Sequence, residues 1–268
     1  MRAILLTSTF RRHVHVANTV AAACDLVGVW QEEKTFRPER YARDEADHAV
    51  IQRHFAERDD FEARYFSSDS AIRLTAGAVH RTVGGGGCSD PAEVALMTAA
   101  RPDVVLVFGT GILHAPVLSA FEGRIINIHL GLSPYYRGAG TNFWPLVNRQ
   151  PEYVGATIHY LDAGIDTGPI IAHARPAIDR ADGPHDIGNK TIVAAAQALL
   201  RASSAHVAGT VRAVPQLTGG RLYQRKDFSA DAVRILYRNF ETGMIEEYLA
   251  TRAARDAALR LVEPEPLA

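Results

Sequence analysis

The sequence predicts an α/β protein built around a mostly parallel β-sheet. Short apolar runs that favour β-strands alternate with longer segments of helical periodicity. At the start of the chain, the runs Ala3–Thr7 and Leu26–Trp30 flank the helical segment Val16–Cys24. A strand, a helix and a strand in this order form a right-handed crossover between parallel strands. The run Val104–Phe108 is apolar throughout, as in strands that are buried on both faces of a parallel sheet.

The remaining elements continue this alternation. Further strands are expected where short apolar runs recur, at Arg124–His129, Val154–Leu161, Pro169–Ala172 and Leu222–Tyr223. Helices are expected where apolar residues recur at helical spacing, at Arg37–Phe66, Ile112–Phe121, Asn142–Asn148, Asp186–Ala208 and Ala230–Arg255. Another helix is expected to be capped by Ser89 or Asp90, with Pro91 in its first turn. The candidate core contacts of the helix at 37–66 are Ala49, Ile51, Phe55 and Phe61.

Composition and charge exclude several classes of protein. The 268 residues include 29 Lys and Arg against 30 Asp and Glu, a net charge of −1, which argues against a generally basic nucleic-acid-binding protein but leaves room for a local basic patch. The amino-terminal apolar run Ala3–Leu6 is too short for a signal peptide, and no apolar stretch approaches the ~18 residues of a membrane span. Cys24 and Cys88 cannot form a disulfide framework, which favours a cytoplasmic protein.

Asn127 and His129 are the first candidates for chemistry. They lie two positions apart at the end of an expected parallel strand, so their side chains share a face and project toward the crevice where open parallel sheets bind ligands. An amide can donate a hydrogen bond to a developing oxyanion, and an imidazole can accept a proton near neutral pH. The pair therefore suits acyl transfer. In the alternative interpretation, Asn127 caps a turn and His129 is a polar strand end.

Asp166 is the third candidate. Gly164, Gly168 and Pro169 force a tight turn around it, on which its carboxylate could orient His129. The alternative is that Asp166 forms an Asx-turn. Since the chain lacks a G-x-S-x-G motif and neither cysteine lies nearby, the sequence predicts direct transfer assisted by acid–base catalysis, without a covalent acyl-enzyme.

Two runs of sequence resemble the folate-dependent formyltransferase family, which includes glycinamide ribonucleotide, methionyl-tRNA and amino-sugar-nucleotide formyltransferases. They are INIHLGLSPYYRGAG at 126–140 and GATIHYLDAGIDTGPII at 155–171. The residues that match the family's pattern are Asn127, His129, Pro134, Arg137, Gly138, His159, Asp166, Gly168 and Pro169. The resemblance covers residues 102–172 and extends over the expected sheet from Met1. It implies a Rossmann-like, mostly parallel sheet of the formyltransferase type with a short C-terminal appendage.

The resemblance also implies roles for individual residues. Asn127, His129 and Asp166 correspond to the catalytic residues, and the formyl donor is 10-formyltetrahydrofolate. The family binds the pterin of this cofactor against the main chain of two segments, represented here by Phe108, Gly109, Thr110, Gly111, Ile112 and Leu113 and by Leu161 and Asp162 within 161–166. Glycines 109 and 111 would let a flat ring approach the main chain closely. The alternative is that 108–113 is only a turn between a strand and a helix.

The chain departs from the family's pattern in two places. Relatives have Ser-Leu-Leu-Pro where this chain has Gly-Leu-Ser-Pro, so a hydroxyl is missing at Gly131. The Gly-rich phosphate loop that glycinamide ribonucleotide enzymes carry after their first strand is replaced by Thr7–His15. The four glycines Gly84–Gly87 could cradle a phosphate or form a mobile loop. No metal site is expected, since His13 and His15 lack a third ligand at a recognisable spacing.

The candidate substrate-binding residues come from two places. Arg11, Arg12 and His13 could meet an anionic substrate at a helix amino terminus capped by Thr7 or Thr9, although a solvated basic turn is an equal alternative. The others lie in the loop after His129, namely Ser133, Tyr135 and Arg137.

The carboxyl-terminal part bears on the acceptor. We expect a catalytic core at residues 1–218 and a hairpin and helical tail at 219–268. Thr218–Phe228 resembles the hairpin of amino-sugar-nucleotide formyltransferases, which often contributes to dimers, whereas the methionyl-tRNA enzymes carry a β-barrel. The resemblance thus implies an enzyme, a homodimer, that transfers formyl groups to a primary amine of an amino-sugar nucleotide or a specialised metabolite. The alternatives are a 10-formyltetrahydrofolate hydrolase, a methionyl-tRNA formyltransferase and a non-catalytic folate- or nucleotide-binding module.

Overall fold

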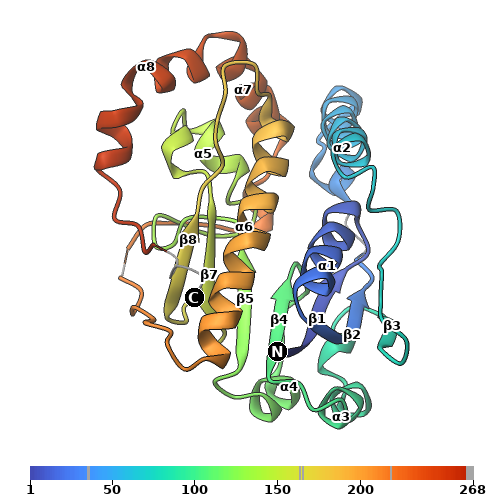
Figure 1. Cartoon of the computed structure of the whole chain (residues 1–268). Helices are drawn as coiled ribbons and strands as arrows, with labels where there is room; N and C mark the ends of the chain where they lie inside the picture. The colour runs from blue at the N-terminus through green and yellow to red at the C-terminus, as the bar shows by residue number, and fades with distance from the viewer. Residues whose placement is uncertain (35–36, 163, 165, 218, 264–268) are drawn as a thin grey trace.

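The computed structural model describes residues 1–34, 37–162, 164, 166–217 and 219–263, and the main sheet of this part of the chain has seven strands (Figure 1). The order across the sheet is β3-β2-β1-β4-β5-β7-β8, in which the first five strands are parallel and β7 is antiparallel to both of its neighbours. The strands are β1 (Arg2–Ser8), β2 (Asp25–Glu32), β3 (Val79–Val83), β4 (Val104–Phe108), β5 (Ile125–His129), β7 (Ala156–Tyr160) and β8 (Ile170–Ala174). The expected fold class is confirmed.

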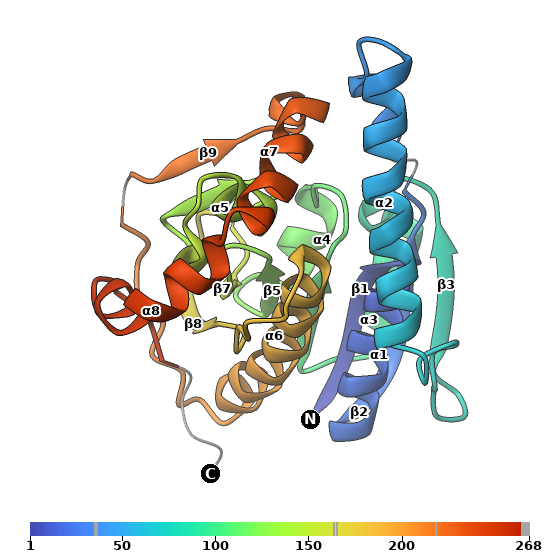
Figure 2. The same cartoon turned by 90° about the horizontal axis from the view of Figure 1, so that it is seen from above.

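Helices cover both faces of the sheet (Figures 1 and 2). Alternate residues of each strand face opposite sides, so β1 directs Leu5 to one core and Leu6 to the other. The first core contains apolar residues of α1 (Arg11–Ala23) and α6 (Pro184–Val207). The second contains residues of α3 (Pro91–Ala99) and α4 (Ala115–Ala120).

The carboxyl-terminal tail packs on the core through helices and a short strand. Helix α7 (Ala230–Glu241) contacts α2 (Glu45–Tyr65) and α5 (Phe143–Val147), and α8 (Met244–Ala257) follows it. Strand β9 (Arg221–Tyr223) pairs with β6 (Tyr136–Gly138), and the ring of Tyr223 stacks on Trp144 at 4.3 Å. The tail therefore reaches the loop that follows β5.

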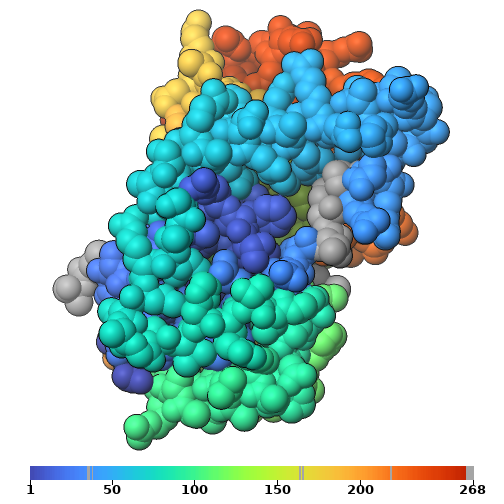
Figure 3. Space-filling model, turned by 90° about the vertical axis from the view of Figure 1, so that its right-hand side faces the viewer, coloured from blue at the N-terminus to red at the C-terminus, as the bar shows by residue number. Residues whose placement is uncertain are grey.

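The amino-terminal half forms the face seen in Figure 3. The light-blue surface around α2 lies above the green surface around α3, and the dark-blue surface of amino-terminal residues lies between them. Helix α2 is the long helix expected at 37–66, although it begins only at Glu45. Of its four candidate core contacts, Ile51 is buried, Phe55 and Phe61 are half-buried and Ala49 is exposed, so the assignment of Ala49 was wrong.

Three expectations about the elements need correction. Helix α1 begins at Arg11 and not at Val16, so Arg11, Arg12 and His13 lie in its first turn. Strand β3 was not expected, because three exposed polar residues lie between its two valines, so this edge strand has neither an apolar run nor an alternating pattern. The expected hairpin of the tail is also wrong for the described residues, because β9 pairs in parallel with β6, which belongs to a distant part of the chain. Residue 218 lies outside the described residues.

Within the described residues, none of the helices combines the length and the apolar character that a membrane crossing requires. The thiols of Cys24 and Cys88 are free. Burial raises the pKa of Cys88 to about 12 and that of Cys24 to about 11, so neither is a reactive thiolate at neutral pH.

Candidate active site

Asn127 and His129 lie on β5 and face the same side of the sheet. Ile126 and Ile128, between and beside them, pack into the core beneath α6, so the two polar side chains point to the opposite face. Asn127 is 9% exposed and His129 is 6% exposed. The expected sharing of a face at the carboxyl end of a parallel strand is what the structure shows.

Asp166 meets His129 from the turn between β7 and β8. Its Oδ2 lies 3.2 Å from Nδ1 of His129. Asp166 has φ of 51°, a left-handed conformation that is uncommon outside glycine. The turn is held by Gln216, whose amide donates to the main-chain oxygens of Asp166 at 2.9 Å and Gly168 at 2.7 Å. Gly168 is required here, because a Cβ would lie 1.8 Å from the oxygen of Tyr160.

His159 completes the cluster, and sequence reasoning gave it no role beyond a motif match. It lies on β7 directly opposite Asn127, fully buried, with Nε2 at 3.0 Å from Nδ2 of Asn127 and 3.7 Å from Oδ1 of Asp166. Its Nδ1 lies 2.8 Å from the oxygen of Tyr160, so we assign the hydrogen to Nδ1, and Nε2 of the neutral ring accepts from Asn127. Finding this contact from sequence requires knowing that β7 pairs with β5.

Burial sets the ionisation of the pair formed by His129 and Asp166. Burial lowers the pKa of His129, the charge of Asp166 acts against this, and His159 adds to the lowering. Burial acts to raise the pKa of Asp166, but the interactions with His159 and His129 outweigh it and hold that pKa below its usual value. At neutral pH we therefore expect a neutral His129 beside an ionised Asp166.

Thr141 supplies a hydroxyl near the place where Gly131 lacks one. A Cβ on Gly131 would lie 2.6 Å from Cβ of Thr141 and 2.7 Å from Nε2 of His129, so the threonine fills the space a serine would need. The Thr141 hydroxyl lies 3.4 Å from Nε2 of His129 and donates to the main-chain oxygen of Leu130. The space beside Gly131 is thus occupied by the side chain of Thr141.

The first expected cofactor segment, residues 108–113, leaves β4 beside β5. Phe108 is buried opposite Ile128, and Gly109 has φ of 73°, where a Cβ would lie 2.4 Å from Nε2 of His13. Ile112 is 65% exposed. Among the described residues, the main-chain N–H and C=O groups of Ile112 and Leu113 have no hydrogen-bond partner. An exposed edge of unpaired main-chain groups fits a flat heterocycle that both donates and accepts hydrogen bonds.

The second expected cofactor segment, 161–166, begins at Leu161, whose N–H donates to the oxygen of Ile125 at 3.0 Å. Asp162 forms a turn in which its Oδ1 accepts from the N–H of Gly164 and the hydroxyl of Thr167. Residues 163 and 165 lie outside the described residues. The segment lies on the same turn as Asp166.

The expected basic site at the start of α1 is altered by an ion pair. Arg12 lies 2.5 Å from Glu62 of α2, and burial lowers the pKa of Arg12. His13 is buried, its Nδ1 has no partner among the described residues, and burial lowers its pKa well below the usual value. Arg11 lies in the first turn of the helix. An anion would therefore have to compete with Glu62 for Arg12.

The expected threonine caps of this helix are wrong. Its amino-terminal cap is Phe10, which forms no side-chain capping hydrogen bond. Thr7 instead ends β1 and donates to the oxygen of Phe108 at 2.8 Å, and Thr9 does not cap the helix. Helix α1 begins two residues after Thr9, so Phe10 occupies the cap position.

The loop after β5 presents one unpaired cation. Ser133 donates its N–H to Thr157, and its own hydroxyl is buried without a partner among the described residues. Tyr135 accepts from the N–H of Arg260 at 2.7 Å. Arg137 is half-buried, and within the part of the chain that the structure describes its guanidinium forms no ion pair or hydrogen bond. Its neighbours in β6 contact His129 and Asp166 through their main chains.

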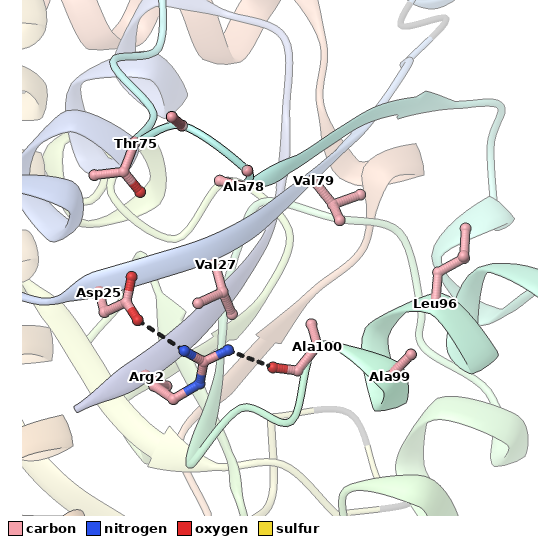
Figure 4. A pocket seen from close by; sticks show the side chains of 11 residues that line it. Arg2, Asp25, Val27, Thr75, Ala78, Val79, Leu96, Ala99 and Ala100 are labelled. Atoms are coloured by element: carbon pink, nitrogen blue, oxygen red, sulfur yellow. Dashed lines mark hydrogen bonds and ion pairs between the residues drawn. The ribbon is translucent and has the colours of Figure 1, made fainter.

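Other features of the molecule do not add to this site. A hollow of about 480 Å³ lies at the amino ends of the parallel strands β1 and β2, whereas His129 lies at the carboxyl end of β5 (Figure 4). Its arginine, Arg2, is already bound by Asp25 at 3.0 Å and by the oxygen of Ala100 at 2.9 Å. The described residues contain no group of three or more His, Cys, Asp or Glu side chains that could hold a metal ion.

Comparisons with known proteins give a consistent result. The family model described as Formyl transferase matches residues 44–203. The methionyl-tRNA formyltransferase of Synechococcus elongatus is 31% identical over 144 residues, which is 52% of this chain and 44% of that protein. The trifunctional purine biosynthetic protein adenosine-3 of Drosophila melanogaster is 32% identical over 123 residues, 46% of this chain and 9% of that protein. The matches thus span less than half the length of these relatives.

Solved structures share the fold at lower identity. A sugar N-formyltransferase from Shewanella is 16% identical with a TM-score of 0.54, covering 85% of this chain and 78% of that one. The phosphoribosylglycinamide formyltransferase of Anaplasma phagocytophilum is 17% identical with a TM-score of 0.56, covering 84% of this chain and 98% of that one. Because the family match includes Asn127, His129 and Asp166 and covers more than half of the sequence, the chain belongs to the formyl transferase family.

Proposed function

We propose that this chain transfers a formyl group from 10-formyltetrahydrofolate to a primary amine of a small molecule, such as an amino-sugar nucleotide or a specialised metabolite. The observation that carries the proposal is the contact of 3.2 Å between His129 and Asp166, with Asn127 beside them on the same strand as His129. An amide donor, an imidazole and an orienting carboxylate are the groups that direct acyl transfer to an amine requires.

Asn127 is the donor to the formyl oxygen. One of its N–H groups donates to His159, which fixes the plane of the amide. The second N–H is left to donate to the oxygen as negative charge develops on it during attack by the amine. Because the amide is held before the reaction, little reorganisation is needed at that moment.

His129 is the base. Asp166 accepts from Nδ1 and holds the ring. Nε2, which lies 3.3 Å from the main-chain oxygen of Tyr136 before substrate binds, is the atom that would take a proton from the attacking amine, directly or through a water. A lowered pKa keeps this ring neutral at pH 7 and thus able to accept that proton. Asp166 stays ionised and stabilises the imidazolium that forms. This imidazolium would return the proton to the departing nitrogen of tetrahydrofolate as the bond from that nitrogen to the formyl carbon breaks.

The residues at 108–113 fit the donor. 10-Formyltetrahydrofolate supplies an activated formyl group, and its pterin carries a flat edge of hydrogen-bond donors and acceptors. The unpaired main-chain groups of Ile112 and Leu113 match such an edge, and the absence of a side chain at Gly109 and Gly111 permits close approach. Leu161 and Asp162, on the turn that carries Asp166, would form the other side of this pocket.

A small acceptor is favoured by the tail and by Arg137. The tail is helical from Ala230 to Ala257 apart from a short break, and it packs on α2 and α5. Arg137 lies between two residues whose main chains contact His129 and Asp166. Its guanidinium is unpaired among the described residues, which suits an acceptor that carries phosphate or carboxylate. Sugar N-formyltransferases are among the proteins that share the fold, whereas curated relatives act, by their names, on methionyl-tRNA.

We also propose that the protein is a cytoplasmic homodimer with the tail at its interface. Leu217 is 59% exposed and Leu222 is 57% exposed, both in or near β9. Burying such side chains would stabilise a dimer. A sedimentation measurement that finds only monomers would contradict this part of the proposal.

The function is tested by incubating the protein with 10-formyltetrahydrofolate and a panel of amines, with mass spectrometry to detect a gain of one formyl group. The panel includes amino-sugar nucleotides, free amino sugars and methionyl-tRNA. Formylation of a nucleotide-linked amine supports the proposal. Formylation of methionyl-tRNA alone, release of formate that does not depend on any amine, or no turnover would each contradict it, in favour of a tRNA enzyme, a hydrolase or a binding module.

A further inference from the structure

Glu32 joins two loops that the sequence leaves unrelated. This residue ends β2 and is 4% exposed. Its Oε1 accepts from the N–H of Gly86 at 3.1 Å, and its Oε2 accepts from the N–H of Gly111 at 3.0 Å. Gly86 belongs to the run of four glycines, and Gly111 belongs to the segment 108–113. Both carboxylate oxygens are thus used to hold the two loops together.

The residue types in the two loops match this arrangement. Gly86 has φ of 79°, a conformation that favours glycine, and a Cβ on Gly87 would lie 2.8 Å from Cβ of Val83. A Cβ on Gly111 would lie 2.7 Å from Oε1 of Glu32, so a side chain there would displace the carboxylate. Gly85 has no such constraint, since a Cβ there would meet open space.

Lys34 makes a second link between β2 and the same segment. Its Nζ donates to the oxygen of Thr110 at 3.0 Å. Glu32 therefore binds the main-chain N–H of Gly111, and Lys34 binds the main-chain oxygen of Thr110. The main-chain N–H and C=O groups of Ile112 and Leu113 have no hydrogen-bond partner among the described residues. The main-chain groups that stay available to a ligand are therefore those of Ile112 and Leu113, directly after the two residues bound by Glu32 and Lys34.

The hydrogen bond between Glu32 and Gly86 also argues against the prediction that Gly84–Gly87 bind a phosphate. The N–H of Gly86 already donates to a carboxylate, so an internal anion occupies the position at which a phosphate would bind. The run serves instead as an anchor for Glu32.

We propose that Glu32 is a positioning residue for the formyl donor: it anchors the segment 108–113 to the glycine loop and thereby fixes the main-chain groups that bind the pterin. This inference rests on the proposed function, since it presumes that residues 108–113 bind the donor. It concerns binding of the donor only, because the hydrogen bonds of the Glu32 carboxylate go to the two loops and not to Asn127, His129 or Asp166.

The test compares E32Q with E33Q. The amide introduced by E32Q keeps one acceptor oxygen but turns an N–H₂ group toward the other main-chain N–H, whereas the exposed neighbour Glu33 undergoes the same loss of charge. Binding of tetrahydrofolate is measured by calorimetry, together with KM for both substrates, kcat and Tm. We expect E32Q to weaken tetrahydrofolate binding and raise KM for the donor about tenfold, the effect of losing one hydrogen bond to a charged group. KM for the amine, kcat and all values for E33Q should match the wild type.

A second pair of variants covers the case in which E32Q folds poorly. G86A strains the turn that presents the N–H bound by Glu32, because Gly86 has φ of 79°, and G85A adds the same methyl group beside it in open space. We expect weaker tetrahydrofolate binding in G86A and unchanged binding in G85A. Wild-type affinity in both E32Q and G86A would overturn the inference and leave the proposed function intact. Failure of the wild-type protein itself to bind tetrahydrofolate would overturn the proposed function, and the inference with it.

Discussion

His129 is the residue whose surroundings determine the pH dependence of the reaction. Burial lowers its pKa from the usual 6.5, and the charge of Asp166 raises it. Since the ring acts in its neutral form, kcat/KM should stay constant down to a pH below 6.5 and fall as the ring becomes protonated. We expect D166N to lower the plateau and to shift this acidic limb to lower pH, because the raising charge is gone. A pH–rate profile for both proteins checks this, and an acidic limb above about pH 7 would contradict it.

Thr141 allows a second prediction at this scale. T141V keeps the shape of the side chain but removes the hydroxyl near Nε2 of His129, whereas T141S keeps the hydroxyl. We expect kcat to fall about tenfold in T141V, a typical cost of one lost polar contact at a buried site, with KM for the donor unchanged. T141S should retain most of the activity. Equal rates in the two variants would show that the hydroxyl has no part in orienting the ring.

The residues of the site differ in how far the sequence reveals them. The spacing of Asn127 and His129 on a strand is enough to predict that they share a face. Asp166 is a candidate because of the tight turn around it, and the resemblance to a family adds a catalytic role, but only the folded turn shows its contact with His129. The role of His159 needs the antiparallel pairing of β7 with β5, which no local pattern encodes. The expected threonine caps failed because the start of α1 at Arg11 is not marked by a capping side chain.

At the scale of elements, the junction of α2, α6 and α7 is sensitive to acid. The hydroxyl of Tyr237 donates to Glu57 at 2.8 Å and lies 3.1 Å from Nδ1 of His54 and 3.2 Å from Nε2 of His185. Burial lowers the pKa of His54 from 6.5 to about 3 and that of His185 to about 4. Nearby Arg58 also disfavours protonation of both rings, while Glu57 favours it.

The sign of the effect on stability follows from these shifts. Below pH 6.5 the unfolded histidines bind protons, while the folded rings stay neutral until about pH 4. The contribution of the two rings to the free energy of unfolding is therefore complete above pH 6.5. It falls with decreasing pH, by up to roughly 1.4 kcal/mol per pH unit for each ring. We expect the loss of free energy of unfolding between about pH 7 and pH 5 to be smaller in H54N/H185N than in the wild type, measured by urea unfolding. An equal loss would contradict the assignment, and H48N, elsewhere on α2, is the control.

Elements also differ in how visible they are in the sequence. The buried strand β4 was predicted at its observed bounds, because an apolar run buried on both faces has a strong signal. Strand β3 has none, since only its first and last residues are half-buried and its middle is exposed. The pairing of β9 with β6 joins two three-residue strands far apart in the sequence, and strands of that length carry too few residues to define a periodicity.

At the scale of the whole molecule, the carboxyl-terminal segment reaches back to the loop after β5. The N–H of Val262 donates to Nδ1 of His173 at 2.9 Å, and the main-chain oxygen of Val262 accepts from the N–H of His173 at 2.7 Å. Nε2 of His173 in turn donates to the oxygen of Ser133 at 2.9 Å. The end of the described chain is therefore connected to the active-site loop through one buried ring.

This connection predicts an effect at a distance. V262P removes the N–H that donates to His173, whereas V262A removes only methyl groups of the same side chain. We expect kcat/KM to fall about fivefold in V262P, because the loop that contains Ser133 loses its support, and to stay near the wild-type value in V262A. Steady-state kinetics and Tm for both variants check this. Equal kinetics in V262P and the wild type would show that the segment supports only the fold.

The central claim is that Asp166 and His129 act together in formyl transfer. Its most direct test is the rate at which labelled formyl passes from 10-formyltetrahydrofolate to the amine acceptor in a single turnover, in D166N and in D162N. Asp162 lies on the same turn and is proposed to meet the pterin through its main chain, which D162N leaves unchanged. Its Oδ1 accepts from Gly164 and Thr167, which asparagine can also do. We predict that the rate falls at least about 100-fold in D166N and changes little in D162N. A rate in D166N that equals the wild-type rate would contradict the account.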